Sequence, residues 1–225
     1  MIKSKSFTYD DFIEKIEKNE PFSFSRYGDG EWNAVFNKGG QNCDGHQYFP
    51  EMGKRLKNIV ISNPKYNMGL QNMAKRLSGP QIDDLLMKNK VDIEWSNSDI
   101  LHHASIKGKL SRLFETLNGK NIVMVGPKHL RQTSKLFPYE QFIEVQKKNC
   151  WEKYKHTNYL VTTAVKKDAD MKVVLFCASM MSNVLVDDMY KNFGNEHFFL
   201  DVGSIFEPYL GLSIRSYHNA IVNKK

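Results

Sequence analysis

The sequence predicts an α/β protein with a Rossmann-like, mostly parallel sheet, helices on both faces, and a single domain over residues 1–225. Three largely apolar runs carry this prediction: 121–125, 173–177 and 198–203. Strands that are buried on both faces read this way, and they are typical of parallel sheets. A chain of 225 residues with 41% hydrophobic and 25% charged residues suits one substantial domain.

The elements of the first half follow from local periodicity. Apolar residues recur at helical spacing after residue 9, and Pro50 suits a first helical turn. Polar, glycine-containing residues 38–48 predict a loop, which we expect to be a mobile flap near the site. The elements expected in chain order are a helix at 9–19, a strand at 21–27, a helix at 31–37, a helix at 50–62, a strand at 67–70, a helix at 71–88 interrupted near Gly79 and Pro80, a strand at 91–95 and a helix from Asn97 or Ser98 to 118.

The second half alternates more clearly. Continuous apolar runs predict its strands, and apolar residues three and four positions apart predict its helices. The elements expected are a strand at 121–125, a short helix at 128–136, a strand at 142–145, a helix at 150–167, a strand at 173–177, a helix ending at 192 and a strand at 198–203.

The polar and glycine residues follow the predicted strands. They are 26–31, Gly126-Pro127, Ala178-Ser179 and 201–204. In parallel sheets, ligands bind beyond the carboxyl ends of the strands, so these segments predict one site at one edge of the sheet.

The segment 26–31, with the sequence RYGDGE, is the most informative of these. On an extended or turning backbone, Asp29 and Glu31 can point the same way and offer two oxygen ligands to a hard divalent cation. Arg26 can bind a phosphate or pair with one of the acids. An alternative is equally open: both acids can simply cap the helix that follows.

RYGDGE at the end of a first strand resembles the motif of glycosyltransferases of the GT-D fold, in which Arg-Phe-Gly-Asp-Gly-Glu carries an Asp-x-Glu metal motif. Tyr27 replaces the usual phenylalanine. The similarity extends, less specifically, through 125–127 and 201–204. The resemblance implies sugar transfer from a nucleoside-diphosphate sugar, with a UDP-sugar favoured, to an acceptor hydroxyl on a glycan or glycoprotein.

The resemblance also implies roles for residues. Asp29 and Glu31 match the metal motif and would hold Mn²⁺ or Mg²⁺, and Glu31 is also a catalytic candidate. Arg26 would contact a phosphate or orient an acid, while Gly28 and Gly30 would let the backbone approach the diphosphate.

Further candidates rest on their place in the chain. Asp201 ends a buried strand and is a candidate acceptor base, or an acid satisfied by backbone amides. Gly126 and Ser179 begin strand-to-helix turns and are candidates for donor binding, although a plain turn accounts for them equally well. Weaker candidates are His46, His102, His103, Glu207, Arg215 and His218.

The remaining expectations concern partners and compartment. The net charge of +7 is spread over many lysines without interleaved aromatic residues, so we expect no nucleic-acid partner. No apolar run approaches the roughly 20 residues of a membrane span, and no secretion signal is evident. Cys43, Cys150 and Cys177 have no metal-binding spacing and read as reduced thiols. We therefore expect a cytoplasmic enzyme that can pair as a homodimer; the alternative is another Rossmann-like transferase that uses a nucleotide or S-adenosylmethionine.

Overall fold

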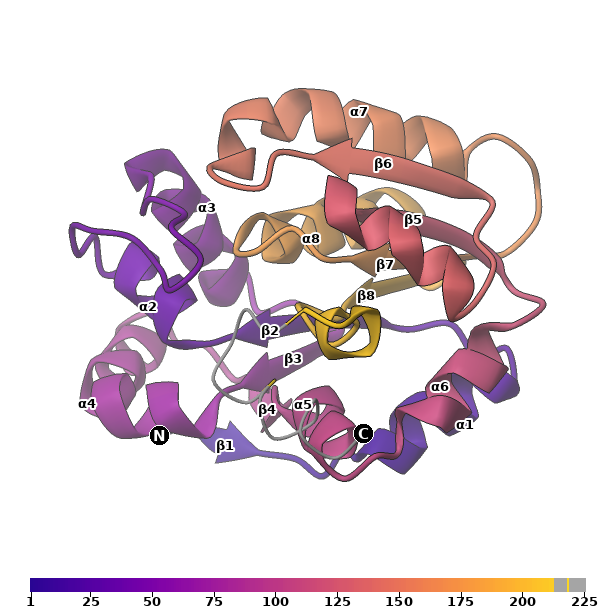
Figure 1. Ribbon diagram of the computed structural model, residues 1–225. Coiled ribbons are helices and arrows are strands. Elements are labelled where there is room, and N and C mark those ends of the chain that lie inside the picture. The colour runs from indigo at the N-terminus through magenta and orange to yellow at the C-terminus, as the bar shows by residue number, and fades with distance from the viewer. Residues whose placement is uncertain (213–217, 219–225) are drawn as a thin grey trace.

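The computed structural model describes residues 1–212 and 218, and these form an α/β fold built on an eight-stranded sheet (Figure 1). The strand order is β1-β4-β3-β2-β8-β7-β5-β6, and every paired neighbour is parallel. The strands are β1 Lys3–Ser4, β2 Ser23–Tyr27, β3 Asn67–Leu70, β4 Glu94–Asn97, β5 Asn121–Pro127, β6 Gln141–Val145, β7 Lys172–Phe176 and β8 Phe198–Asp201. The predicted fold class is confirmed, and the sheet is parallel throughout.

Helices cover both faces of the sheet, because successive strand residues point to opposite sides. Phe24 of β2 packs into one apolar layer, while Tyr27 of the same strand packs into the other. The α-helices are α1 Tyr9–Glu17, α2 Asp29–Val35, α3 Pro50–Ile61, α4 Asn72–Lys88, α5 Ile100–Ile106, α6 Leu110–Leu117, α7 Tyr154–Val165 and α8 Met181–Phe193; the 3₁₀ helices are η1 Lys128–Lys135, η2 Cys150–Lys153 and η3 Glu207–Leu210. Helices α2, α3, α4, α7 and α8 bury their apolar residues on the Tyr27 side, and α1, α5 and α6 on the Phe24 side.

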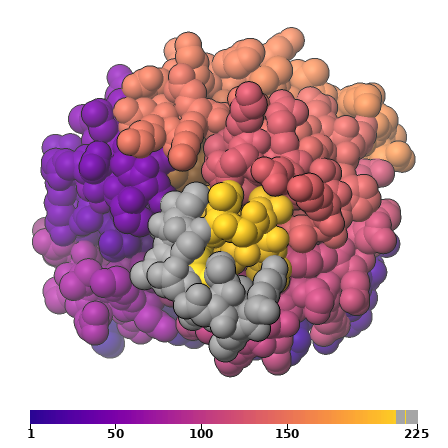
Figure 2. Space-filling model, viewed as in Figure 1, coloured from indigo at the N-terminus to yellow at the C-terminus, as the bar shows by residue number. Residues whose placement is uncertain are grey.

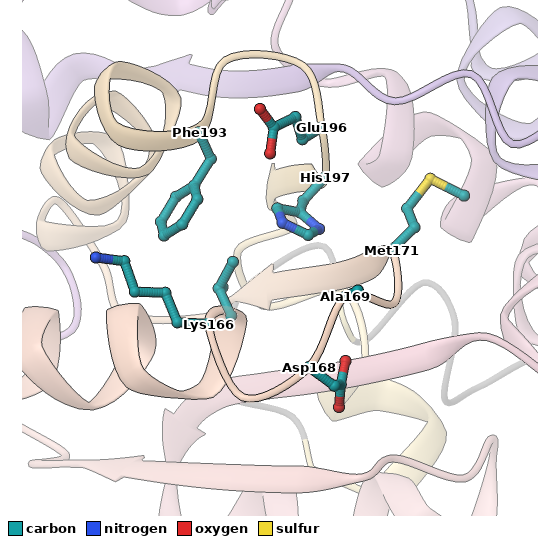
Figure 3. A pocket seen from close by; sticks show the side chains of 8 residues that line it. Lys166, Asp168, Ala169, Met171, Phe193, Glu196 and His197 are labelled. Atoms are coloured by element: carbon teal, nitrogen blue, oxygen red, sulfur yellow. The ribbon is translucent and has the colours of Figure 1, made fainter.

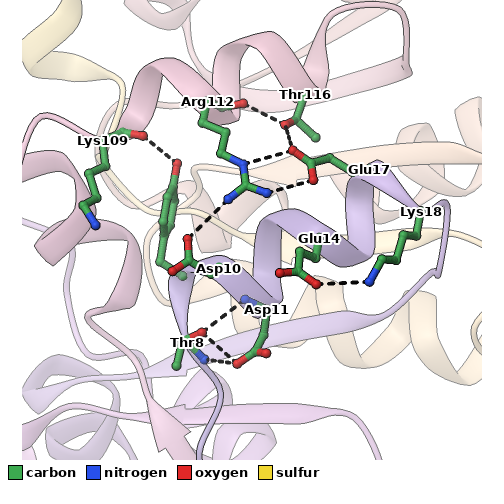
Figure 4. Close-up of polar contacts among 10 residues, drawn as sticks. Thr8, Asp10, Asp11, Glu14, Glu17, Lys18, Lys109, Arg112 and Thr116 are labelled. Atoms are coloured by element: carbon green, nitrogen blue, oxygen red, sulfur yellow. Dashed lines mark hydrogen bonds and ion pairs between the residues drawn. The ribbon is translucent and has the colours of Figure 1, made fainter.

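Polar contacts join α1 to α6 on the Phe24 side of the sheet (Figure 4). The Arg112 guanidinium donates to both carboxylate oxygens of Glu17, at 3.1 and 2.9 Å, and to Asp10 at 3.4 Å. These side chains are exposed, and solvent-exposed ion pairs add little to stability. The two helices are therefore held chiefly by the apolar side chains that they bury.

Several predicted elements differ in detail. The single helix expected to end at 118 is two helices, because Gly108 adopts a φ of +70° and ends α5 before α6 begins. The predicted interruption of 71–88 is wrong, since α4 runs through Pro80. The segment after β5 is a 3₁₀ helix, and the short strand β1, which pairs with β4, was not predicted.

Candidate functional site

A cavity of about 640 Å³ opens where the parallel strands end. Ligand pockets span about 300–1,000 Å³, so this one can hold a small molecule. Segments after β2, β3, β4, β7 and β8 supply its walls. Of the principal predicted site residues, all except Gly126 line it, namely Arg26, Gly28, Asp29, Gly30, Glu31, Ser179 and Asp201.

Arg26 is held against the β4 end of the cavity. Its Nε donates to the Ser98 carbonyl oxygen at 3.0 Å, and its Nη2 lies 3.3 Å from His102 Nδ1. The register of the sheet accounts for this contact. Arg26 pairs with Gly69 of β3, where a Cβ would lie only 2.8 Å from Ser98 Cα, so the glycine lets Ser98 come within reach of the guanidinium.

Asp201 faces the same guanidinium from the end of β8. The chain turns directly after it: Gly203 has a φ of +60°, and its amide donates to Asp201 Oδ1 at 3.1 Å. Burial raises the pKa of Asp201 to about 6, although the Arg26 charge and backbone hydrogen bonds oppose the rise. A carboxyl with that pKa can accept a proton near neutral pH.

Glu31 is the second perturbed acid of the cavity. Burial and the neighbouring Asp201 raise its pKa to about 7, against the lowering effect of backbone hydrogen bonds and Arg26. One of its oxygens accepts a hydrogen bond from the Gly28 amide at 2.8 Å. Glu31 thus caps α2 from its third position, which is the alternative that the sequence left open.

Helix α2 begins at Asp29, two residues earlier than predicted, and this corrects the geometry expected for the two acids. Both lie in the first helical turn, where a spacing of two residues separates directions by about 200°. The extended-backbone route to two convergent carboxylates is therefore wrong. Asp29 is exposed and Glu31 partly exposed, and each lines the cavity from its own side of the turn.

The donor set of α2 fits a cation that is shared with a phosphate. Among residues 1–212 and 218, no three His, Cys, Asp or Glu side chains form a metal cluster. Mg²⁺, however, usually binds through one or two carboxylates, water and substrate phosphate rather than in a cage made by the protein alone. Two carboxylates on one open cavity, with the pKa of Glu31 raised by burial and by Asp201, are compatible with such a site.

Asp99 and His102 of the β4–α5 segment form the wall opposite α2. His102 Nδ1 lies 3.5 Å from Asp99 Oδ1. Burial disfavours the Asp99 charge, but the His102 hydrogen bond and Arg26 together hold its pKa below the ordinary value. His103 also lines the cavity. Sequence reasoning singled out the histidines but missed Asp99, because the strand predicted at 91–95 ends two residues earlier than β4, which Asp99 follows closely.

Loop 38–48 lies against the β7 end of the cavity. Asn42 Nδ2 donates to Ser179 Oγ at 2.9 Å, and Asn42 Oδ1 accepts from the amides of Asp44 and His46 at 3.1 and 2.9 Å. Ser179 itself has a φ of +51°, which turns the chain sharply before α8. The loop predicted as a flap is thus part of the cavity wall; its motion stays a prediction.

Other candidates lie elsewhere. Gly126 is buried within β5, where a Cβ would be 3.0 Å from Leu130 Cδ1 and 3.2 Å from Cys177 Cβ. Glu207 lies 3.1 Å from His129 and 3.9 Å from His218, and it does not line the cavity. His46 is buried near Cys150, and Arg215 lies outside the described residues.

A second hollow lies at the opposite edge of the sheet, at the amino ends of β7 and β8 (Figure 3). It holds about 510 Å³ between residues 165–171 and 193–197. His197 is occupied there, because its Nδ1 accepts from the Lys172 amide at 3.1 Å. Since parallel sheets bind ligands at their carboxyl ends, this hollow is the weaker candidate.

Comparisons with known proteins establish the fold. No family model and no curated protein sequence matches the chain. A structure described as a new glycosyltransferase (DUF1792) from Streptococcus sanguinis is 20% identical, with a TM-score of 0.67 over 95% of this chain and 87% of that one. Two further structures of domain of unknown function 1792, one described as a distinct glycosyltransferase fold, are 18% identical, with TM-scores of 0.65 and 0.63 over 92% of this chain and 80% of theirs. At these identities the likeness shows a shared fold.

Within the described residues, no helix is both long and apolar enough to cross a bilayer.

Proposed function

We propose that this protein is a metal-dependent glycosyltransferase that moves a sugar from a nucleoside-diphosphate sugar, with a UDP-sugar favoured, to an acceptor hydroxyl on a glycan or glycoprotein. One observation carries the proposal: Arg26, Glu31 and Asp201 meet in a cavity at the carboxyl edge of the sheet. Support comes from the fold, which is shared with structures described as glycosyltransferases.

Asp201 and Glu31 are the proposed proton acceptors for the attacking hydroxyl. Their pKa values of about 6 and about 7 lie close to neutral pH, where a general base works best. Asp201 is the favoured base, because Glu31 is also proposed to hold the metal ion. Arg26 keeps this group of acids together and offers its guanidinium to a phosphate at the same point.

Asp29 and Glu31 would hold Mn²⁺ or Mg²⁺, which when bound neutralises charge on the departing nucleoside diphosphate. Gly28 and Gly30 leave that side of the cavity without bulk: a Cβ at Gly30 would meet Asn42 Cβ at 3.5 Å, and one at Gly28 would meet Gln71 and Glu31 at 3.2 Å. Ser179 and Asn42 close the β7 side. The chain would therefore surround the diphosphate with acids, the Arg26 guanidinium and two glycines that have no side chain.

The test is a panel of nucleotide sugars incubated with the protein, with and without Mn²⁺, and read by released nucleoside diphosphate. We expect metal-dependent turnover of at least one UDP- or dTDP-sugar. Asp201→Asn should lower this rate by about 10²-fold or more, because the amide cannot accept a proton.

The matched control is Asp84→Asn, an exposed acid of α4 whose partner is Lys88 at 2.8 Å. Its turnover should equal that of the wild type. Absence of turnover and of binding across the panel would contradict the proposal, and stabilisation by S-adenosylmethionine without metal would favour the other transferase class instead.

A further inference from the structure

An aromatic hollow of about 740 Å³ lies outside the candidate site, where η2 and the start of α7 meet α3. Its walls include Phe49, Arg55, Trp151, Tyr154 and His156. In Figure 2 the orange segment that contains the start of α7 lies beside the purple segment of α2 and α3. The hollow has the size of a small-molecule site and combines apolar rings with a few polar groups, as such sites do.

The ring of Tyr154 is fixed from below. Its hydroxyl donates to the Asp188 carboxylate, and Asn158 Nδ2 donates to the same hydroxyl at 3.0 Å and to Asp188 at 2.8 Å. Arg55 donates to Asp188 at 2.6 Å, and its guanidinium carbon lies 5.6 Å from the centre of the Tyr154 ring. A side chain held by so many partners loses little freedom when a ligand arrives.

Trp151 stacks on this fixed ring, with centroids 4.7 Å apart and planes 19° from parallel. Unlike Trp32 and Trp95, which are 0% and 1% exposed, Trp151 is only partly buried. It therefore presents aromatic surface to the hollow in a set orientation.

The hollow adjoins the candidate site through loop 38–48. Asn42 lines the candidate cavity, and its backbone amide donates to the His46 carbonyl at 2.9 Å. His46 Nδ1 in turn lies 3.7 Å from the Sγ atom of Cys150, the residue before Trp151. Met180 completes the boundary, since it lies 3.9 Å from the Cβ position of Gly30 and shares a small hollow with Trp151. Asn42, His46 and Cys150 thus form a chain of contacts from the candidate cavity to Trp151.

We propose that the hollow at Trp151 and Tyr154 binds a saccharide unit, and that, given the function proposed above, this unit belongs to the acceptor. A pyranose has an apolar face of C–H groups that suits the negative face of an aromatic ring, and a rim of hydroxyls that needs polar partners. The polar partners around the rings are Glu51, Arg55, Glu152, Lys153, Lys155 and His156. The two acids among these basic residues accept hydrogen bonds from hydroxyls and would repel a polyanion.

The first experiment titrates the protein with methyl glycosides and disaccharides and follows tryptophan fluorescence. The sequence contains three tryptophans, and the other two are buried, so a change in accessibility reports Trp151. We expect a saturable fluorescence change with at least one saccharide. Calorimetry measures binding in the variants that lack the tryptophan. Trp151→Ala should abolish binding, whereas Trp151→Phe, which keeps an aromatic ring, should retain it. No response across the panel, or a response to uridine nucleotides in place of saccharides, would overturn the site.

The second experiment measures sugar transfer and donor hydrolysis side by side in the same variants. Trp151→Ala should lower the ratio of transfer to hydrolysis about tenfold or more, through a higher KM for the acceptor. Tyr159→Ala removes an aromatic ring of α7 that is 67% exposed and outside the hollow, and it should leave both rates unchanged.

The outcomes separate the two proposals. Donor hydrolysis with an unchanged ratio in Trp151→Ala would overturn the acceptor site alone. Saccharide binding at Trp151 without any donor hydrolysis would support the saccharide site and count against the proposed function. Trp151→Phe guards against a folding defect, because its thermal midpoint and its ratio should both stay near the wild-type values.

Discussion

Arg26 sets the charge balance of the candidate site at the scale of single residues. Its positive charge lowers the pKa of Asp99, Glu31 and Asp201, yet the last two remain raised. Burial keeps them raised, and among the described residues four carboxylates, Asp29, Glu31, Asp99 and Asp201, line the cavity with this one guanidinium. This imbalance is what a bound cation would relieve, and it is a reason to expect that the site is less stable empty than occupied.

Gly203→Ala tests the place of Arg26. A Cβ there would lie 2.1 Å from Arg26 Nη1, so the guanidinium has to move. Gly194 has the same φ of +60° but no atom within 4 Å of its Cβ position, so Gly194→Ala is a matched control. Both variants should lose about 1–3 kcal/mol to the positive φ, measured by urea unfolding. Only Gly203→Ala should also lose donor turnover; equal turnover in the two variants would show that the position of Arg26 does not matter.

Asp201→Asn tests the pKa of the buried acid through stability. The folded-state pKa of about 6 lies above the ordinary 3.8, so the folded protein binds this proton more tightly than the unfolded chain. Below about pH 4 both states are protonated and ionisation costs nothing; the cost grows from about pH 4 to 6 and is complete above that. Asp201→Asn should thus stabilise the protein by about 1–3 kcal/mol at pH 7.5 and by almost nothing near pH 4. Destabilisation at pH 7.5 would contradict the raised pKa.

At the scale of elements, the contact between α2 and α3 places the acidic turn. A Cβ at Gly53 of α3 would lie 2.1 Å from the Ala34 carbonyl oxygen of α2, a backbone atom that cannot step aside. The glycine lets the two helices touch. Because α2 begins at Asp29, this contact also fixes where Asp29 and Glu31 stand.

Gly53→Ala should therefore destabilise the protein by about 1–3 kcal/mol or more through overpacking, and it should weaken metal-dependent turnover as α2 shifts. Gly79 of α4 offers the comparison, since nothing lies within 4 Å of its Cβ position. Gly79→Ala should stabilise the helix by about 0.5–1 kcal/mol. The thermal midpoint should fall in Gly53→Ala and rise in Gly79→Ala. If both midpoints moved in the same direction, this account of the helix contact would be wrong.

The strands of this fold could be predicted, whereas the start of α2 could not. Runs such as 121–125 and 173–177 are apolar on both faces, and such short runs are typical of buried parallel strands. The acidic turn is different, because Asp and Glu suit both a metal loop and a helix start. The structure has the helix start, with α2 packed on α3 at Gly53, and sequence periodicity does not reveal that contact. At Gly108 the local signal was present but was outweighed. A glycine commonly ends a helix, but the apolar residues around Gly108 favoured one continuous helix.

The candidate site was predictable to the extent that it follows strand ends. Arg26, Ser179 and Asp201 all lie there, and all line the cavity. Gly126 follows the same rule and does not line it, because β5 lies beyond β7 in the sheet order, away from β2 and β8. Asn42 enters from a loop, through one hydrogen bond that no local pattern encodes.

At the scale of the whole molecule, the charges are unevenly arranged. The chain carries a net charge of +7, yet Asp29, Glu31, Asp99 and Asp201 gather in one cavity. A basic surface attracts an anionic donor from solution, while the acidic cavity favours a donor that arrives with a divalent cation. The hollow proposed to bind a saccharide is connected to this cavity through loop 38–48.

The most direct test of the central claim is the thermal unfolding of the protein with UDP, with Mn²⁺, and with both together. A ligand present at about 100 times its dissociation constant adds about 2.7 kcal/mol to the free energy of unfolding. We predict that UDP and Mn²⁺ together raise the midpoint by several degrees, more than the sum of their separate effects, and that an Asp29→Asn/Glu31→Gln double variant loses this gain. Equal stabilisation of the double variant, or none of the wild type by any nucleoside diphosphate with metal, would contradict the account.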